Sequence, residues 1–197
     1  EDPYELYRTL GHVETVLLSR QYQFINLSLV PDLPVEDQDV HAWTAVIDSI
    51  LSDGETLMTV AVGNNGERDA ALGLNRIQVP SDSVNALSVG AADRSGPDWK
   101  RAGYSATGPG RSPGRRKPDV VAFGGAPKEY FHVAAPGSRP NLAATLGTSF
   151  AAPLALRSAV GIRAILGDPV HPLTIKTLLV HGCESNDTGV VPAMRSV

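Results

Sequence analysis

The residue whose surroundings point most directly to chemistry is Ser149, in the segment Gly147-Thr148-Ser149-Phe150-Ala151-Ala152-Pro153. A Gly-containing stretch precedes it, and the Ala-rich residues that follow predict a helix over 150–166. The start of a helix offers unpaired N–H groups and the positive end of the dipole. An oxyanion that forms beside Ser149 would therefore meet its backbone N–H, as acyl transfer to a serine requires. The alternative is a serine that only caps a buried helix.

A second polar group with possible chemistry is Asn64, which follows an apolar run of strand length on the turn Gly63-Asn64-Asn65-Gly66. Its side-chain NH₂ group is a donor suited to the same oxyanion. A plain turn is the alternative interpretation, because Asn and Gly both favour turn conformations. Asn65 stands next to Asn64 on the same turn.

The elements that must position these side chains alternate along the chain. Apolar residues at helical spacing predict helices over 4–19 and 41–51, and short apolar runs predict strands over 24–29 and 57–62. Apolar strands that alternate with helices favour a parallel sheet covered on both faces. We therefore expect an α/β fold of three layers. Further strands are predicted over 85–91, 120–123 and 131–134, and a last helix over 173–180.

Four segments, in this order, resemble the subtilisin-like serine proteases (subtilases, peptidase family S8). The resemblance covers nearly the whole chain, and the segment around Ser149 is specific by itself. It implies serine-type endopeptidase activity, with Ser149 as nucleophile and Asn64 in the oxyanion hole. The family's motif places this donor directly after the glycine, which makes Asn65 the weaker choice. The segments are Ile25-Asn26-Leu27-Ser28-Leu29, Val60-Ala61-Val62-Gly63-Asn64-Asn65-Gly66, Lys117-Pro118-Asp119-Val120-Val121-Ala122 and Gly147-Thr148-Ser149-Phe150-Ala151-Ala152-Pro153.

The same resemblance implies how a polypeptide substrate would bind, as a strand added between two backbone segments. By motif match these are Ser28-Leu29-Val30 and Ala61-Val62-Gly63. The family usually has Gly after the Ser-Leu pair, whereas this chain has Val30. We expect the extra bulk to give a smaller or reshaped pocket for the first substrate side chain.

A serine nucleophile also needs a histidine base and an Asp that orients it. The resembled family places both before the strand predicted over 24–29, in Asp-Ser/Thr-Gly and His-Gly-Thr-His motifs. Asp2 and His12 precede that strand here, with neither motif around them. After the serine, His181-Gly182 and Asp187-Thr188-Gly189 match only by letters. We therefore interpret 1–197 as a partial subtilase domain, incomplete at its N-terminal side and inactive alone.

Two other interpretations stay open. The chain could be a non-catalytic pseudoprotease domain that binds extended peptides or a partner protein, or it could obtain the Asp and His from another chain. A sheet without its neighbouring strands exposes an edge, which invites pairing. We therefore expect a homodimer or a second chain that covers this edge.

Composition excludes several other classes of function. The formal net charge of −4 argues against a nucleic-acid binder, and we interpret the arginines between 111 and 117 as an exposed loop. We find no apolar run of about 18 residues that predicts a membrane span. A single cysteine, Cys183, permits no intrachain disulfide, which favours the cytoplasm. No acidic cluster predicts a metal site, although the resemblance leaves room for Ca²⁺ in loops.

Overall fold

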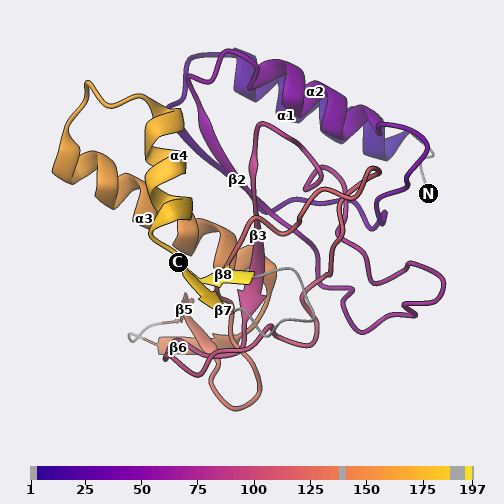
Figure 1. The fold of residues 1–197 in the computed structure, drawn as a ribbon, viewed down its shortest axis with the longest axis vertical. Coiled ribbons are helices and arrows are strands. Elements are labelled where there is room, and N and C mark those ends of the chain that lie inside the picture. Colours follow the sequence, from indigo (N-terminus) through magenta and orange to yellow (C-terminus); the bar gives the residue numbers. More distant parts are fainter. Residues whose placement is uncertain (1–3, 138–140, 187–193, 197) are drawn as a thin grey trace.

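The computed structural model describes residues 4–137, 141–186 and 194–196. Its centre is a parallel sheet in the order β1-β2-β3-β4, with bounds β1 Phe24–Leu27, β2 Leu57–Ala61, β3 Leu87–Ala92 and β4 Val120–Phe123 (Figure 1). The register pairs Leu27 with Val60 and Ala61 with Val89. The expected α/β class and parallel sheet are confirmed.

Side chains of successive strand residues point to opposite faces, which divides the core between two helical layers. Met58 and Val60 of β2 contact a cluster that includes Ile47, beneath α1 (Glu5–Leu18) and α2 (Ala42–Ile50). Leu57 and Ala61 of the same strand face the larger cluster under α3 (Thr148–Leu166) and α4 (Pro172–His181). The three layers predicted from the sequence are therefore present.

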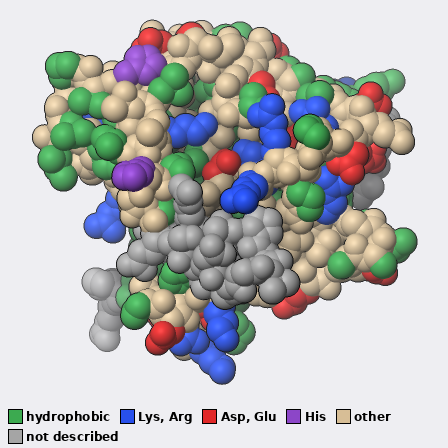
Figure 2. All heavy atoms as spheres, in the orientation of Figure 1, with side chains coloured by type: hydrophobic (Ala, Val, Ile, Leu, Met, Phe, Trp, Pro, Cys, Tyr) green, Lys and Arg blue, Asp and Glu red, His purple; other side chains and the backbone are tan. Residues whose placement is uncertain are grey.

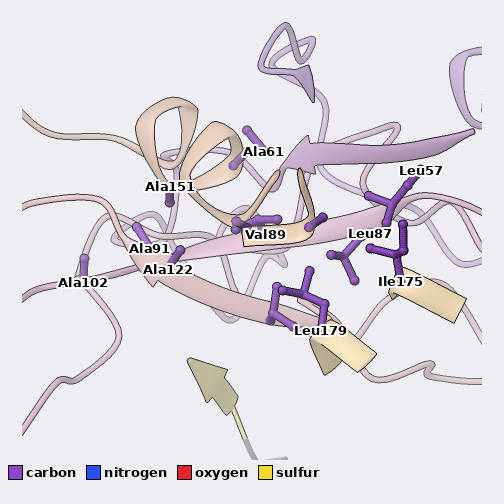
Figure 3. Close-up of a cluster of buried hydrophobic side chains, with 14 residues drawn as sticks. Leu57, Ala61, Leu87, Val89, Ala91, Ala102, Ala122, Ala151, Ile175 and Leu179 are labelled. Atoms are coloured by element: carbon purple, nitrogen blue, oxygen red, sulfur yellow. The ribbon is translucent and has the colours of Figure 1, made fainter. Parts of the chain in front are cut away.

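Small residues allow α3 to lie close against the sheet. Four of its alanines, spaced three or four residues apart after the first pair, are fully buried: Ala151, Ala152, Ala155 and Ala159. In Figure 3, Ala151 of the helix lies above Ala91 and Ala122 of the sheet. By length and composition α3 could cross a membrane. Its contacts with β1 to β4 identify it instead as a core helix of this fold.

The strand predicted over 131–134 is present but does not join the parallel sheet. It forms β5 (Phe131–Ala135), which pairs antiparallel with β6 (Asn141–Thr145). Only residues 136–140 connect the two strands, too few for a parallel crossover. Beside β4, two strands absent from the sequence-based prediction extend the main sheet, namely β8 (Met194–Ser196) and then β7 (Glu184–Asn186).

The basic run at 111–117 is only partly the exposed loop that was expected. Arg115 and Arg116 are exposed, but Lys117 is buried and its Nζ lies 2.8 Å from Asp119 Oδ2. Arg111 donates through Nε to the buried Asp82. Figure 2 shows basic and acidic side chains interspersed on the visible face. Two of the basic side chains in this run, Arg111 and Lys117, thus form ion pairs with carboxylates of the fold.

Candidate active site

The site forms where the strands of the parallel sheet end. Ser28 follows β1, Asn64 comes shortly after β2, and Gly124 follows β4. Carboxyl ends of parallel strands share one edge of the sheet, which is where α/β proteins bind ligands. The N-terminus of α3 meets this edge, because Gly147 N–H donates to the Gly124 carbonyl (2.9 Å). Segments far apart in the sequence thereby converge on Ser149.

Ser149 lies in the first turn of α3 and is partly exposed. Its carbonyl accepts a hydrogen bond from Ser28 Oγ at 3.1 Å. Across the described ranges, neither its hydroxyl nor its backbone N–H has a hydrogen-bond partner. Ser149 is thus held through its main chain, while its hydroxyl and N–H groups are available.

A chain of hydrogen bonds supports that anchor from inside the sheet. Thr59 Oγ1 donates to Asn26 Oδ1 (3.1 Å), and Asn26 Nδ2 donates to Ser28 Oγ (2.9 Å). Ser28 then donates to the Ser149 carbonyl. The path runs from β2 through β1 to α3, so the sheet fixes the position of the Ser149 backbone. Sequence reasoning did not assign roles to the side chains of Asn26 and Thr59.

The orientation of Asn64 follows from its contacts with Thr148. Asn64 Oδ1 accepts from the Thr148 N–H at 2.9 Å and from Thr148 Oγ1 at 3.0 Å. Because two donors hold the oxygen, the NH₂ group must face the other way. That nitrogen would lie 3.5 Å from a Cβ built on Gly147. An available side-chain donor and the Ser149 N–H therefore both lie at the first turn of α3.

Asn65 has a different and structural role. Its side chain is buried, and Nδ2 donates to the carbonyls of Leu74 (2.6 Å) and Arg76 (2.8 Å). It therefore braces the loop after the turn. The NH₂ group of Asn65 is therefore already used within the fold, whereas the role of Asn64 as oxyanion donor stays a prediction.

The two segments expected to bind a substrate strand flank the site. On one side, Val62 uses both backbone groups within the fold, with Val89 (3.3 Å) and Gln78 (2.9 Å), and the Gly63 carbonyl accepts from Ala106 (3.1 Å). Of the backbone groups of Val62 and Gly63, the Gly63 N–H is the one without a partner among the described residues, so an added strand on that side would use it. Binding of a peptide by these segments stays a prediction.

In the other segment, Ser28-Leu29-Val30, the Ser28 hydroxyl donates to the Ser149 carbonyl and Leu29 is half exposed. Val30 packs against the core cluster beneath α1 and α2. This contact directs at least part of the extra bulk of Val30 into the core. The smaller or reshaped pocket remains a prediction.

Aromatic rings hold the start of α3 from the hairpin side. Phe150 stacks on Phe131 of β5 with ring centroids 5.3 Å apart, and Phe131 stacks on Phe123 of β4 at 5.8 Å. Phe150, the residue after Ser149, thus packs on β5, and β5 in turn packs on β4. The strand β5 itself was predicted over 131–134, but its pairing with β6, which sets the position of Phe131, was not.

The five histidines of the chain cap helices or lie exposed on the surface. His41 and His171 cap α2 and α4, each accepting from a backbone N–H through Nδ1. His12, His132 and His181 are exposed. Of these five, none hydrogen-bonds to Ser149 within the described residues. The alternative Asp motif, Asp187-Thr188-Gly189, lies outside the residues that the structure describes.

Metal-binding clusters are a separate question. Where the structure describes the chain, no three His, Cys, Asp or Glu side chains gather as metal ligands would. The Ca²⁺ allowed for by the resemblance therefore has no assigned ligands here.

Comparison with known proteins identifies the fold around this site. The model of the subtilase family, peptidase S8, matches residues 9–193, whereas no curated protein matches the chain. Among solved structures, a cold adapted subtilisin-like serine proteinase has 18% identity and a TM-score of 0.65, with 95% of this chain and 59% of that chain covered.

Two further structures give the same picture. The prenylagaramide maturation protease PagA has 21% identity and a TM-score of 0.64, with 91% of this chain and 57% of that chain covered. A structure of the subtilase cytotoxin SubAB has 15% identity and a TM-score of 0.68, with 94% and 61% covered. The chain spans less than two thirds of each of these three structures. Because the family model matches residues 9–193, the chain belongs to the subtilase family.

Proposed function

We propose that the protein containing this chain is a serine endopeptidase. Ser149 Oγ attacks the carbonyl carbon of a peptide bond and passes its proton to a histidine base, which returns it to the leaving amine. Water then attacks the acyl-enzyme, and release of the acid restores the serine. Asn64 Nδ2 and the Ser149 N–H hold the oxyanion in both steps.

One observation carries the proposal, namely the orientation of Asn64. Thr148 donates twice to Oδ1, at 2.9 and 3.0 Å, so the amide presents its NH₂ group beside the nucleophile. These two bonds satisfy donors at the start of α3, and they leave the NH₂ group available on the opposite side of the amide. An available serine hydroxyl in the same helical turn supplies the second half of the machinery.

We propose further that the base and its Asp come from residues outside this chain, and that the chain alone is inactive. This is supported by the positions of the histidines, none of which hydrogen-bonds to Ser149 in the described part of the molecule. It is also supported by the solved subtilisin-like structures, of which this chain covers 57–61%.

Hydrolysis of quenched fluorogenic peptides by the natural protein that contains this chain tests the proposal. We expect cleavage of internal peptide bonds, its loss in Ser149→Ala, and no cleavage by residues 1–197 alone. Persistent cleavage by Ser149→Ala would exclude Ser149 as the nucleophile. Complete inactivity of the natural protein would favour the pseudoprotease that binds peptides.

The outer edge of β1 is the place where a second polypeptide would pair. Within the described residues only β2 pairs with this strand. Charged residues, especially Lys, and Pro usually protect an edge strand from pairing with another chain. The strand Phe24-Ile25-Asn26-Leu27 contains no Lys, Arg or Pro. We expect residues 1–197 alone to form a dimer through this edge. A monomer over the micromolar range in sedimentation would contradict this.

A further inference from the structure

The tyrosine at position 104 makes contacts that the mechanism above does not use. Its hydroxyl donates to the Gly125 carbonyl at 2.8 Å and accepts from the Gly147 N–H at 3.1 Å. Burial raises the pKa of Tyr104 to about 12, although the Gly147 N–H opposes the rise. The hydroxyl therefore keeps its proton at neutral pH and can donate and accept at once.

These contacts tie the start of the nucleophile helix to the end of β4. Gly147 also donates to the Gly124 carbonyl at 2.9 Å, so its N–H is shared between two acceptors. A Cβ on Gly124 would lie 2.9 Å from the Tyr104 hydroxyl and 3.0 Å from the Gly147 carbonyl. The hydroxyl thus fills the corner between the turn after β4 and the first turn of α3.

The backbone of the same tyrosine holds the turn that carries Asn64. The Tyr104 carbonyl accepts from the Gly66 N–H at 2.8 Å. A Cβ on Gly66 would lie 2.1 Å from the Ser105 carbonyl oxygen, so the Asn64 turn packs directly on the chain around Tyr104. One residue therefore contacts both turns that carry a donor for the oxyanion.

We propose that Tyr104 is a positioning residue that fixes the spacing between Asn64 Nδ2 and the Ser149 N–H. Its carbonyl holds the Asn64 turn and its hydroxyl holds Gly147, two residues before Ser149. Donors stabilise an oxyanion only from about 2.7–3.1 Å, so loss of one tether weakens catalysis without removing a donor. The catalytic meaning of this role rests on the proposed function, whereas the tether itself does not.

Tyr104→Phe is the informative variant, because it keeps the ring and removes only the hydroxyl. Tyr130→Phe is the matched control, since Tyr130 is exposed. The first readout is amide hydrogen exchange by NMR on residues 1–197. Loss of one hydrogen bond should speed exchange at Gly147 roughly three- to tenfold in Tyr104→Phe, relative to β2 amides, and not in Tyr130→Phe. Unchanged exchange at Gly147 would overturn the tether.

The second readout is peptide hydrolysis by the natural protein. We expect Tyr104→Phe to lower kcat roughly tenfold while KM changes less than about twofold, because only the transition state needs the oxyanion donors. Faster exchange with unchanged kcat would overturn the positioning role. Hydrolysis that survives Ser149→Ala would refute the proposed function instead, and the exchange result would still decide the tether.

Discussion

Gly147 offers a test of the backbone geometry at the start of α3. Its φ is +153°, a conformation that residues with a Cβ rarely adopt. A Cβ there would meet Asn64 Nδ2 and a Phe150 ring carbon at 3.5 Å each, which is ordinary van der Waals contact. The cost of Gly147→Ala therefore comes from backbone strain rather than from a clash, about 1–3 kcal/mol.

For a chain of 197 residues, each kcal/mol lowers Tm by about 2–4 °C. Gly147→Ala should therefore lower Tm by about 2–12 °C in thermal unfolding followed by circular dichroism. Gly161→Ala is the matched control, in the middle of the same helix, where a Cβ meets nothing within 4 Å. It should stabilise the chain by about 0.5–1 kcal/mol, because alanine is the better helix former.

The two substitutions should shift Tm in opposite directions, so a general effect of replacing glycine by alanine cannot explain both results. Equal Tm values for Gly147→Ala and the wild type would show that an alanine adopts the start of α3 without strain. The turn before Ser149 would then not require a glycine at position 147.

Three further predictions concern the site and its support. Asn64→Ala should lower kcat of the natural protein by roughly 10²–10³ with little change in KM, and an unchanged kcat would exclude Asn64 as an oxyanion donor. Asp119→Ala leaves the buried ammonium of Lys117 without its carboxylate and should lower the free energy of unfolding by about 3–5 kcal/mol; an unshifted urea midpoint would contradict this. Because the pKa of Tyr104 is raised to about 12, its stabilising contribution is complete below about pH 10 and lost as the pH rises toward 12. Urea midpoints of the wild type should therefore fall relative to Tyr104→Phe across that window, whereas parallel profiles would refute the linkage.

Much of the fold could be predicted because its central strands and its helices have local sequence patterns typical of these elements. Apolar runs such as 57–62 and helical spacing such as 41–51 predicted the four central strands and the four helices. Pairing of β5 with β6 could not be predicted in the same way, because a short apolar run does not specify its partner. The strand β6 lies in Asn-Leu-Ala-Ala-Thr, which is low in β-branched and aromatic residues.

In the candidate site, too, residues in local motifs could be predicted, and residues brought in by long-range contacts could not. Ser149 and Asn64 stand in motifs whose letters lie close together, so sequence reasoning found them. The supporting side chains act over long separations, as when Ser28 contacts Ser149 across 121 residues. Tyr104 lies in a loop-rich stretch with no helical or strand pattern, and only the folded chain places it between the two turns.

Reaction with a fluorophosphonate, followed by mass-spectrometric mapping of the modified residue, tests the central claim most directly. A fluorophosphonate labels a serine that a histidine base activates and an oxyanion hole serves. We predict labelling of Ser149 in the natural protein that contains this chain, and none in residues 1–197 alone. Labelling of Ser149 in the isolated chain would contradict an external base, and an intact natural protein labelled at another serine would contradict the account of the site.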